Sequence, residues 1–287
     1  MSLTLRLLSV SAALALTLSA ASDKDVIKFV KRGLESNPNL KVYDVKIKEK
    51  QALDRPKGWD AYVIDFKIGV KRGSHEQNIS QTDIIFVHDR YVAPDLMDIK
   101  TNRSMKDRIV LSLDESFYDK THHIYGNENA KHKIVVFSDP LCPFCREVVP
   151  ELFEAAKKHP DTFALYYYHL PIEQLHPASV PLAKAIIYLK AKGDKEAIEK
   201  IYKTDFDYAQ KDEKKVLEEL HKKLGIKLSV EQINEPWVVK ELKEDREKAK
   251  ALMVKGTPAV FFDGKFDRKR EEYKKYLPKS ERKSEKK

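Results

Sequence analysis

The stretch Val135-Val136-Phe137-Ser138-Asp139-Pro140-Leu141-Cys142-Pro143-Phe144-Cys145 joins a short apolar run to a pair of cysteines. An apolar run of this length is typical of a strand that is buried on both faces. Ser138-Asp139-Pro140 ends the strand, and the Cys-Pro-Phe-Cys segment opens a helix that we predict over 143–158. Pro143 suits the first helical turn, because the backbone N–H groups there have no intrahelical partner.

Cys142 and Cys145 are the only cysteines among the 287 residues. Thiol–disulfide exchange needs a thiolate that attacks and a second thiol that resolves the mixed disulfide. Free N–H groups and the helix dipole favour a thiolate at the start of a helix, so we predict Cys142 as the nucleophile and Cys145 as the resolving thiol. Pro143 and Phe144 complete this active-site motif, and Phe144 argues against the strongest oxidising power because it offers the thiolate no hydrogen bond.

Two other interpretations of the cysteine pair remain open. An inert bridge across so short a loop removes little entropy from the unfolded chain, so it explains the pair poorly. A metal site would need two more ligands, and no other cysteine exists to supply them. We therefore favour redox activity and expect neither a metal nor a cofactor.

A second motif, Gly256-Thr257-Pro258-Ala259-Val260, opens another apolar run, which Asp263-Gly264 ends with a hairpin turn. Pro258 is compatible with an ordinary proline at the start of a strand. Alternatively, Thr257 and Pro258 face the thiols, and the missing N–H leaves neighbouring backbone groups free to bind an extended substrate segment. We favour this substrate-binding role.

The remaining pattern completes an α/β domain over 126–278. We expect a strand over 163–170, then a helical insertion, a long helix over 237–254, and a final helix over 268–276. The signals for the ends of helices in the insertion are Asp194, Asp212, Gly193, Gly225 and the capping box Ser229/Gln232. The order of strand, helix, strand, helices, hairpin and helix predicts a thioredoxin fold with a helical insertion.

The amino-terminal part predicts a leader and a smaller domain. Residues 1–21 have the pattern of a cleaved signal peptide, because an apolar run over 7–18 is followed by Ser19-Ala20-Ala21. The run is shorter than the roughly 20 apolar residues of a membrane span, although a retained anchor remains an alternative. Residues 22–97 predict an α+β domain: a helix over 25–35, followed by a small antiparallel sheet.

That sheet is predicted from three stretches and one bend. Its strands are expected over 40–48, 62–70 and 83–91, with a bend at Arg72-Gly73-Ser74. Residues 98–125 are polar and irregular, and we expect a linker with one or two helical turns.

Charge gives little indication of function. The net charge is +9, but lysine and glutamate are interspersed along the helices, which is typical of solvated faces. The basic tail over 279–287 also contains Glu281 and Glu285. We therefore expect no nucleic-acid partner.

The two motifs, together with Gly126-Asn127-Glu128-Asn129-Ala130, resemble the DsbC and DsbG disulfide isomerases of the bacterial periplasm, whose catalytic domain is DsbA-like. The resemblance covers about 125–276. Asp139 and Thr257 match that branch, and Val136 stands where thioredoxin and DsbA carry a buried acid.

The resemblance implies a periplasmic protein with a cystatin-like domain at 22–97 that forms a homodimer, so that two active sites face each other across a cleft. Its substrates would be exported proteins that contain cysteines, and a DsbB- or DsbD-like membrane protein would be its redox partner.

The direction of the reaction remains open. The expected activity is to isomerise or to form disulfides, because the proline after the first cysteine is also DsbA-like. The alternatives are a DsbA-like dithiol oxidase that a membrane partner recharges, and a non-catalytic periplasmic chaperone.

Overall fold

The computed structural model describes residues 21–72 and 75–282, which form two compact units that divide between Ile109 and Val110. Apart from Ala21, the predicted signal peptide lies outside the described residues. Within the described ranges, every helix is too short or too polar to cross a bilayer.

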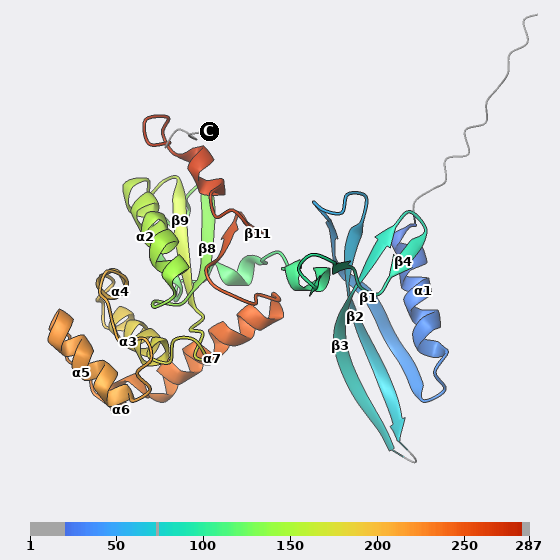
Figure 1. Ribbon diagram of the computed structural model, residues 1–287, viewed down its shortest axis with the longest axis horizontal. Helices are drawn as coiled ribbons and strands as arrows, with labels where there is room; N and C mark the ends of the chain where they lie inside the picture. Colours follow the sequence, from blue (N-terminus) through green and yellow to red (C-terminus); the bar gives the residue numbers. More distant parts are fainter. Residues whose placement is uncertain (1–20, 73–74, 283–287) are drawn as a thin grey trace, which may run out of the picture. The chain divides into compact units, whose positions relative to one another are not determined.

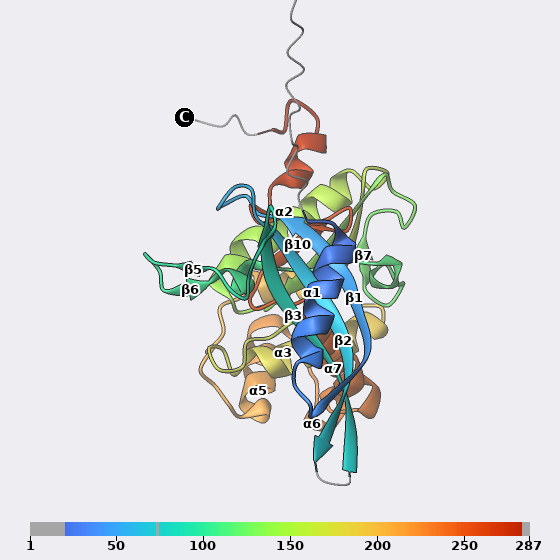
Figure 2. The ribbon, with the colours of Figure 1, turned by 90° about the vertical axis from the view of Figure 1, so that its right-hand side faces the viewer.

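The amino-terminal unit is a four-stranded antiparallel sheet, in the order β1-β2-β3-β4, with one helix across it (Figure 2). Its elements are α1 (Asp23–Glu35), β1 (Leu40–Ala52), β2 (Asp60–Arg72), β3 (His75–His88) and β4 (Tyr91–Ala93). Ser22 and Asp25 form a capping box at the start of α1. The helix buries Val26 against Tyr62 and Ile64, which share one face of β2.

All three predicted strands are longer than we predicted, and β3 ends at His88, before the separate short strand β4. β2 and β3 pair without interruption from Asp60–Val87 to Arg72–His75. The outer part of β3 is exposed and polar, so it lacks the alternation of apolar residues on which the prediction rested. The helix-plus-antiparallel-sheet architecture is confirmed, and the cystatin-like comparison stays a prediction.

The stretch 98–125, which we predicted as a linker with one or two helical turns, has two 3₁₀ turns and also short strands that were not predicted. It contains or overlaps β5 (Met97–Asp98), β6 (Arg103–Ser104), η1 (Met105–Arg108), η2 (Glu115–Phe117) and β7 (His123–Tyr125). β7 is an edge strand of the second unit, in which His123 and Tyr125 pair with β9 and Ile124 is buried. A single apolar residue between polar ones gave no strand signal.

The second unit contains a five-stranded sheet in the order β11-β10-β8-β9-β7 (Figure 1). Its remaining strands are β8 (His132–Ser138), β9 (Phe163–His169), β10 (Ala259–Phe262) and β11 (Lys265–Phe266). β8 and β9 are parallel, and the other pairs are antiparallel. This is the predicted thioredoxin-like sheet.

Helices cover both faces of this sheet. They are α2 (Pro143–Lys158), α3 (Ser179–Ala191), α4 (Ala197–Tyr202), α5 (Glu213–Leu224), α6 (Val230–Ile233) and α7 (Pro236–Ala251), followed by η3 (Glu272–Tyr276). Val149 and Phe153 of α2 share a core cluster with Val136 and Tyr167. α7 contacts β9 and also α3.

Several predicted helix ends are confirmed, but the prediction of a helix over 268–276 was wrong. Asp212 caps α5, Gly225 ends it in the left-handed region, and Ser229 forms the capping box of α6. The helix predicted over 268–276 is only a 3₁₀ turn, η3, because the Asp267 carboxylate binds the backbone N–H groups of the residues after it and holds them in a loop.

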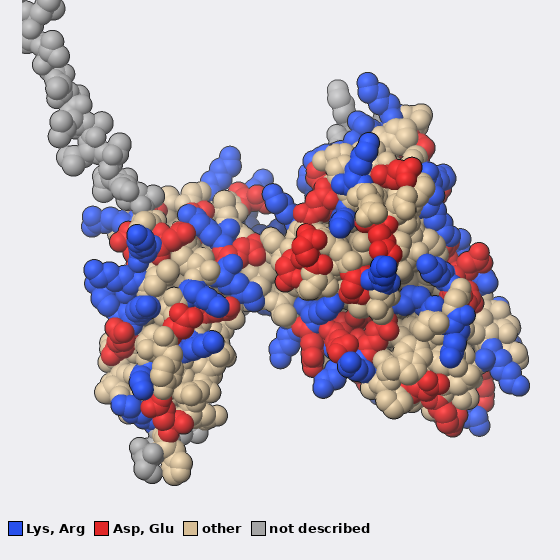
Figure 3. Space-filling model, turned by 180° about the vertical axis from the view of Figure 1, so that it is seen from behind, with Lys and Arg blue, Asp and Glu red and all other residues tan. Residues whose placement is uncertain are grey.

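Figure 3 shows lysine and arginine side chains interspersed with aspartate and glutamate over the face that it presents. Several of these opposite charges are one helical turn apart, as in Lys158–Glu154 and Lys223–Glu219. Exposed pairs of this kind are screened by solvent and contribute little to stability.

Candidate active site

Cys142 is the N-cap residue of α2, and Pro143 occupies the first turn of that helix. β8 ends at Ser138, and the Cys142 N–H donates to the carbonyl of Asp139, 3.2 Å away. This turn puts both cysteines at the amino-terminal end of α2. Both are free thiols: Cys142 is 7% exposed and Cys145 is completely buried.

Asp139 organises the turn before Cys142, although it is itself fully buried. One of its carboxylate oxygens accepts from the N–H of Leu141 at 2.8 Å. The other accepts from the N–H of Ile172 at 2.8 Å and contacts Nδ1 of His176 at 3.1 Å. Asp139 therefore ties the cysteine loop to the loop that follows β9. The sequence gives no signal of the contact with His176, because 37 positions separate it from Asp139.

The two thiols have opposite electrostatic environments. A hydrogen bond from the Cys145 thiol, together with the backbone N–H groups of Cys145 and Phe144, outweighs burial and lowers the pKa of Cys142 to about 5. Burial raises the pKa of Cys145, and the neighbouring Cys142 adds to that effect. Cys142 is thus the thiolate and Cys145 the protonated thiol near neutral pH.

Thr257 lies beside Cys142 and directly precedes Pro258. The peptide bond between them is cis, and Sγ of Cys142 lies 3.7 Å from the carbonyl oxygen of Thr257. The Thr257 hydroxyl is buried and has no hydrogen-bond partner in the described part of the chain. It nevertheless lowers the pKa of Cys142, because it can donate to the thiolate form.

Arg270 holds the loop that contains Pro258. Its Nε donates to the carbonyl oxygen of Pro258 at 3.0 Å. The backbone N–H of Arg270 donates to the Asp267 carboxylate at 2.9 Å, and Arg270 has a φ of 59°. Sequence reasoning missed this residue, because nothing local distinguishes it from the surrounding basic residues.

Behind Cys145 lies a group of buried hydroxyls. Oγ of Ser138 is 2.6 Å from the hydroxyl of Tyr202, which is 2.8 Å from the hydroxyl of Tyr167. Tyr202 is the last residue of α4 in the helical insertion. The sequence pattern predicted the strand that contains Tyr167, but it gave no signal that the hydroxyl of Tyr202 would lie beside that of Tyr167.

Apolar side chains are exposed near the thiols and near the loop that Asp139 binds. Phe144, between the two cysteines, is 65% exposed. Leu175 is also largely exposed, and it lies in the loop that Asp139 holds through Ile172 and His176. Surface apolar residues at a site with a reactive thiol are suited to contact a polypeptide.

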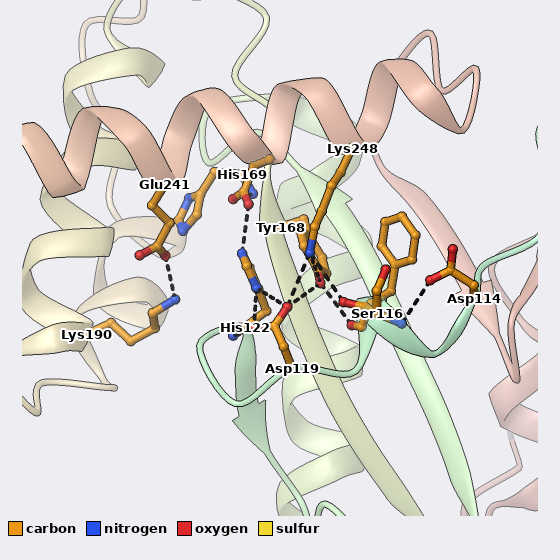
Figure 4. Close-up of polar contacts among 11 residues, drawn as sticks. Asp114, Ser116, Asp119, His122, Tyr168, His169, Lys190, Glu241 and Lys248 are labelled. Carbon is orange, nitrogen blue, oxygen red and sulfur yellow. Dashed lines mark hydrogen bonds and ion pairs between the residues drawn. The ribbon is translucent and has the colours of Figure 1, made fainter.

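A separate polar network lies between β9, α7 and residues 114–122 (Figure 4). His122 contacts Asp119 through Nδ1 and the buried Asp245 through Nε2, both at 2.7 Å. Burial alone would lower the pKa of His122, but these two carboxylates outweigh it and raise that pKa. Tyr168 and Lys248 also contact Asp119. The network joins α7 to β9 and to the residues around Asp119.

His169, at the end of β9, is fully buried, and both of its ring nitrogens are without hydrogen-bond partners in the described part of the chain. Burial holds its pKa well below the ordinary value. His169 is therefore neutral. Among the described residues, no group of three or more His, Cys, Asp or Glu side chains is arranged to hold a metal ion.

The predicted site residues thus lie together: Cys142, Pro143, Phe144 and Cys145 open α2, and Thr257 contacts Cys142. A family model described as thioredoxin matches residues 118–278, which is more than half of the chain.

Curated sequences give a second match. Na(+)/H(+) antiporters named NhaA 1 from three Mycobacterium strains, KMS, JLS and MCS, are 25% identical over 150 residues, or 50% of this chain. The chain spans about a quarter of the length of these curated relatives, 24%.

Solved structures with a similar fold include three bacterial proteins. A thioredoxin-like oxidoreductase from Silicibacter pomeroyi is 24% identical, with a TM-score of 0.45, covering 54% of this chain and 88% of that one. A periplasmic thioredoxin-like protein from Salmonella enterica serovar Typhimurium is 19% identical, with a TM-score of 0.44 and coverage of 54% and 87%. BdbD from Bacillus subtilis is 17% identical, with a TM-score of 0.46 and coverage of 58% and 94%.

Proposed function

Because this chain belongs to the thioredoxin family, we propose that it is a thiol–disulfide oxidoreductase that isomerises or forms disulfides in exported proteins. One observation carries the proposal: the low-pKa thiol of Cys142 stands at the start of α2, directly in front of the buried thiol of Cys145. A reactive thiolate with a resolving thiol one helical turn away is the minimal apparatus for exchange.

The exchange proceeds in two steps. The Cys142 thiolate attacks one sulfur of a substrate disulfide, a mixed disulfide forms, and the other substrate sulfur leaves as a thiolate. Cys145 then loses its proton and attacks Sγ of Cys142. The second substrate sulfur leaves and takes up a proton, and a Cys142–Cys145 disulfide remains. In the reverse direction the same steps oxidise a substrate dithiol. Isomerisation occurs when another substrate thiol attacks the mixed disulfide before Cys145 does, which frees Cys142 and rearranges the substrate disulfides without net oxidation.

The proposed substrate segment lies along Thr257 and Pro258. The carbonyl of Thr257 is 3.7 Å from Sγ of Cys142, so a chain that pairs with this backbone brings its own sulfur near the nucleophile. The exposed side chain of Phe144 supports apolar contacts with an unfolded client.

The activity is tested with the full chain and three variants. Cys142→Ala should abolish both insulin reduction and the refolding of scrambled ribonuclease, whereas Cys145→Ala should accumulate mixed disulfides. Thr204→Val, which changes a side chain whose hydroxyl caps the carbonyl of Lys200, is the matched control and should keep full activity. Unchanged activity in Cys142→Ala would refute the proposal. Mass spectrometry of the complexes trapped by Cys145→Ala would identify the clients and the redox partner.

A second candidate is a dithiol oxidase that a DsbB-like membrane protein recharges. The low pKa of Cys142 favours it, because a stabilised thiolate favours the reduced enzyme and makes the disulfide form a better oxidant. The redox state of the pair in cells separates the two candidates. An isomerase, which a DsbD-like partner would keep reduced, is isolated with free thiols, and an oxidase is isolated with the disulfide.

We place the protein in the periplasm on the strength of the predicted signal peptide at 1–21. Fractionation of cells, with sequencing of the mature amino terminus near Ser22, tests this. A non-catalytic chaperone remains the contrasting function, and it requires that a Cys142→Ala/Cys145→Ala variant retains full biological activity.

The amino-terminal unit supports the proposal of a homodimer. β3 pairs with β4 only from Phe86 to His88, so in the described residues the edge of β3 over 76–83 has no strand partner. The other edge strand, β1, is protected against pairing by two irregularities in register and by several lysines. β3 pairs with β2 without any irregularity, so its edge suits a second copy of the same strand in antiparallel pairing.

A further inference from the structure

The three hydroxyls behind Cys145 form a continuous chain inside the protein. Ser138, Tyr202 and Tyr167 are 0%, 2% and 1% exposed, and they come from the end of β8, the end of α4 and the middle of β9. The spacings of 2.6 Å and 2.8 Å between successive oxygens are those of hydrogen bonds. Tyr167 and Tyr202 share the core cluster of Cys145.

Ser138 links this chain to the resolving thiol. Burial dominates at Cys145 and raises its pKa, whereas the backbone N–H of Asp139 and the hydroxyl of Ser138 act in the opposite direction as donors to the sulfur. A buried thiolate without donors would be costly, because nothing would replace its lost hydration. The sulfur must nevertheless become a thiolate before it can attack.

Counting donors shows which state of Cys145 the chain favours. Each hydroxyl donates one hydrogen bond and has lone pairs to accept others. With a thiolate at Cys145, Tyr167 donates to Tyr202, Tyr202 donates to Ser138, and Ser138 donates to the sulfur. In this arrangement all three protons have an acceptor. With a thiol at Cys145, the sulfur is neutral and only a weak acceptor, so the same hydrogen bond from Ser138 contributes less.

We propose that Ser138, Tyr202 and Tyr167 are positioning residues that stabilise the Cys145 thiolate while it attacks the mixed disulfide at Cys142. The inference rests on the proposed function and concerns its second step alone. In that step the S–H bond of Cys145 breaks, the sulfur–sulfur bond between the two cysteines forms, and the bond from Cys142 to the substrate breaks. The departing substrate thiolate takes up a proton.

The tyrosines donate hydrogen bonds in this step, but they do not become acids or bases. Burial holds the pKa of both Tyr167 and Tyr202 well above the ordinary value, so each keeps its proton. Their contribution is the orientation of the hydroxyl chain, which the edge-on contact between the rings of Tyr167 and Tyr202 fixes in advance.

The two steps can be timed separately with Ellman's reagent. The reduced full chain is first converted at acid pH, where Cys142 reacts and Cys145 stays protonated, and one thionitrobenzoate is released. A rapid jump to higher pH then starts the attack of Cys145, and the release of the second thionitrobenzoate is followed as a function of pH. This second release reports the ionisation and reactivity of Cys145.

We expect Tyr202→Phe and Ser138→Ala to slow the second release at neutral pH by about tenfold, since each removes a hydrogen bond to a charged group or the support of one. The pH midpoint of the second release should move upward, and the rate of the first release should stay at the wild-type value. Tyr167→Phe changes the hydroxyl farthest from Cys145, so it should also slow the second release, but by a smaller factor.

Tyr168→Phe is the matched control. Tyr168 is adjacent in β9, but its hydroxyl lies on the opposite face of the sheet, where it donates to Asp119 at 3.0 Å. This variant should leave both releases unchanged. An unchanged second release in both Tyr202→Phe and Ser138→Ala would overturn the inference, and so would an equal slowing of both releases. A wild-type chain that never releases the second thionitrobenzoate would instead refute the proposed function.

Discussion

Sγ of Cys142 lies 3.7 Å from the carbonyl oxygen of Thr257, although 115 positions separate the two residues in the chain. The contact brings together the amino-terminal end of α2 and the residues just before β10, whose partner in the sheet is β8. The thiol of Cys142 and the carbonyl of Thr257 are therefore positioned by α2, β8 and β10, which belong to the same unit.

Thr257→Val should raise the pKa of Cys142 above its value of about 5, because valine has the same shape but cannot donate to the thiolate. The pH dependence of thiolate absorbance in the reduced protein measures this. The same substitution at Thr204, whose hydroxyl donates to the carbonyl of Lys200, should leave the midpoint in place. An unaltered midpoint in Thr257→Val would show that its hydroxyl does not reach the sulfur.

The reduced protein should become more stable with rising pH. The folded pKa of Cys142, about 5, lies below the unfolded value of 9.0, so the stabilisation is fully present above 9.0 and is lost as the pH falls through about 5. Between these limits the free energy of unfolding should rise by up to roughly 1.4 kcal/mol per pH unit. Urea unfolding of the reduced protein measures it, and reduced Cys142→Ser should lack this part of the slope.

Arg270→Ala should slow exchange with disulfide substrates, because the carbonyl of Pro258 loses the donor that fixes its loop. We expect the free energy of unfolding to fall by about 1–3 kcal/mol, since a hydrogen bond to a charged group is lost. Insulin reduction and urea unfolding measure the two effects. Lys269→Ala removes the same charge from an exposed neighbour and should change neither quantity; equal behaviour of the two variants would contradict a specific role for Arg270.

His122→Ala should destabilise the protein by about 3–5 kcal/mol, because the completely buried Asp245 carboxylate would lose its charged partner. The raised pKa of His122 means that its contribution is fully present below the unfolded value of 6.5 and is lost as the pH rises through the folded value. Urea unfolding across this range measures the change.

The control for His122→Ala is His221→Ala, because His221 is exposed on α5. That variant should match the wild type at every pH. A gap between wild type and His122→Ala that widens with rising pH would contradict the assigned charge state.

The double variant Asn78→Lys/Ser80→Lys should convert the proposed dimer into monomers, because like charges would meet along the open edge of β3. The mass in solution, from light scattering of the full chain, measures this. Ala52→Lys at the end of the other edge strand, β1, is the control and should remain dimeric. A wild-type chain that is already monomeric would refute the dimer itself.

The parts of the site that the sequence predicted are those with a local signature. The Cys-Pro-Phe-Cys segment carries its helix start within four residues, and the strands β8 and β10 are short continuous apolar runs. Both signals depend only on neighbouring residues. The helix α2 ends at Lys158 as predicted, and the hairpin at Asp263-Gly264 joins β10 to β11.

The supporting residues were not predictable, because their roles arise only from contacts between distant segments. His176 reaches Asp139 across 37 positions, and Tyr202 reaches Ser138 across 64. The residues on either side of His176 and of Tyr202 in the sequence do not distinguish them from ordinary surface or core residues. The edge strand β7 was missed for the same reason, since its pairing partner in β9 rather than its own polar composition makes it a strand.

Tyr202 ends α4, so the helical insertion contributes one of the hydroxyls that we propose stabilise the Cys145 thiolate, and it reaches that site through Ser138 at the end of β8. Changes in the insertion should therefore alter the rate at which Cys145 resolves the mixed disulfide, without any change to the Cys-Pro-Phe-Cys segment or to the loop that contains Thr257 and Pro258. An engineer who wants a slower-resolving version, with longer-lived covalent complexes for capturing clients, could alter α4 alone and keep both cysteines.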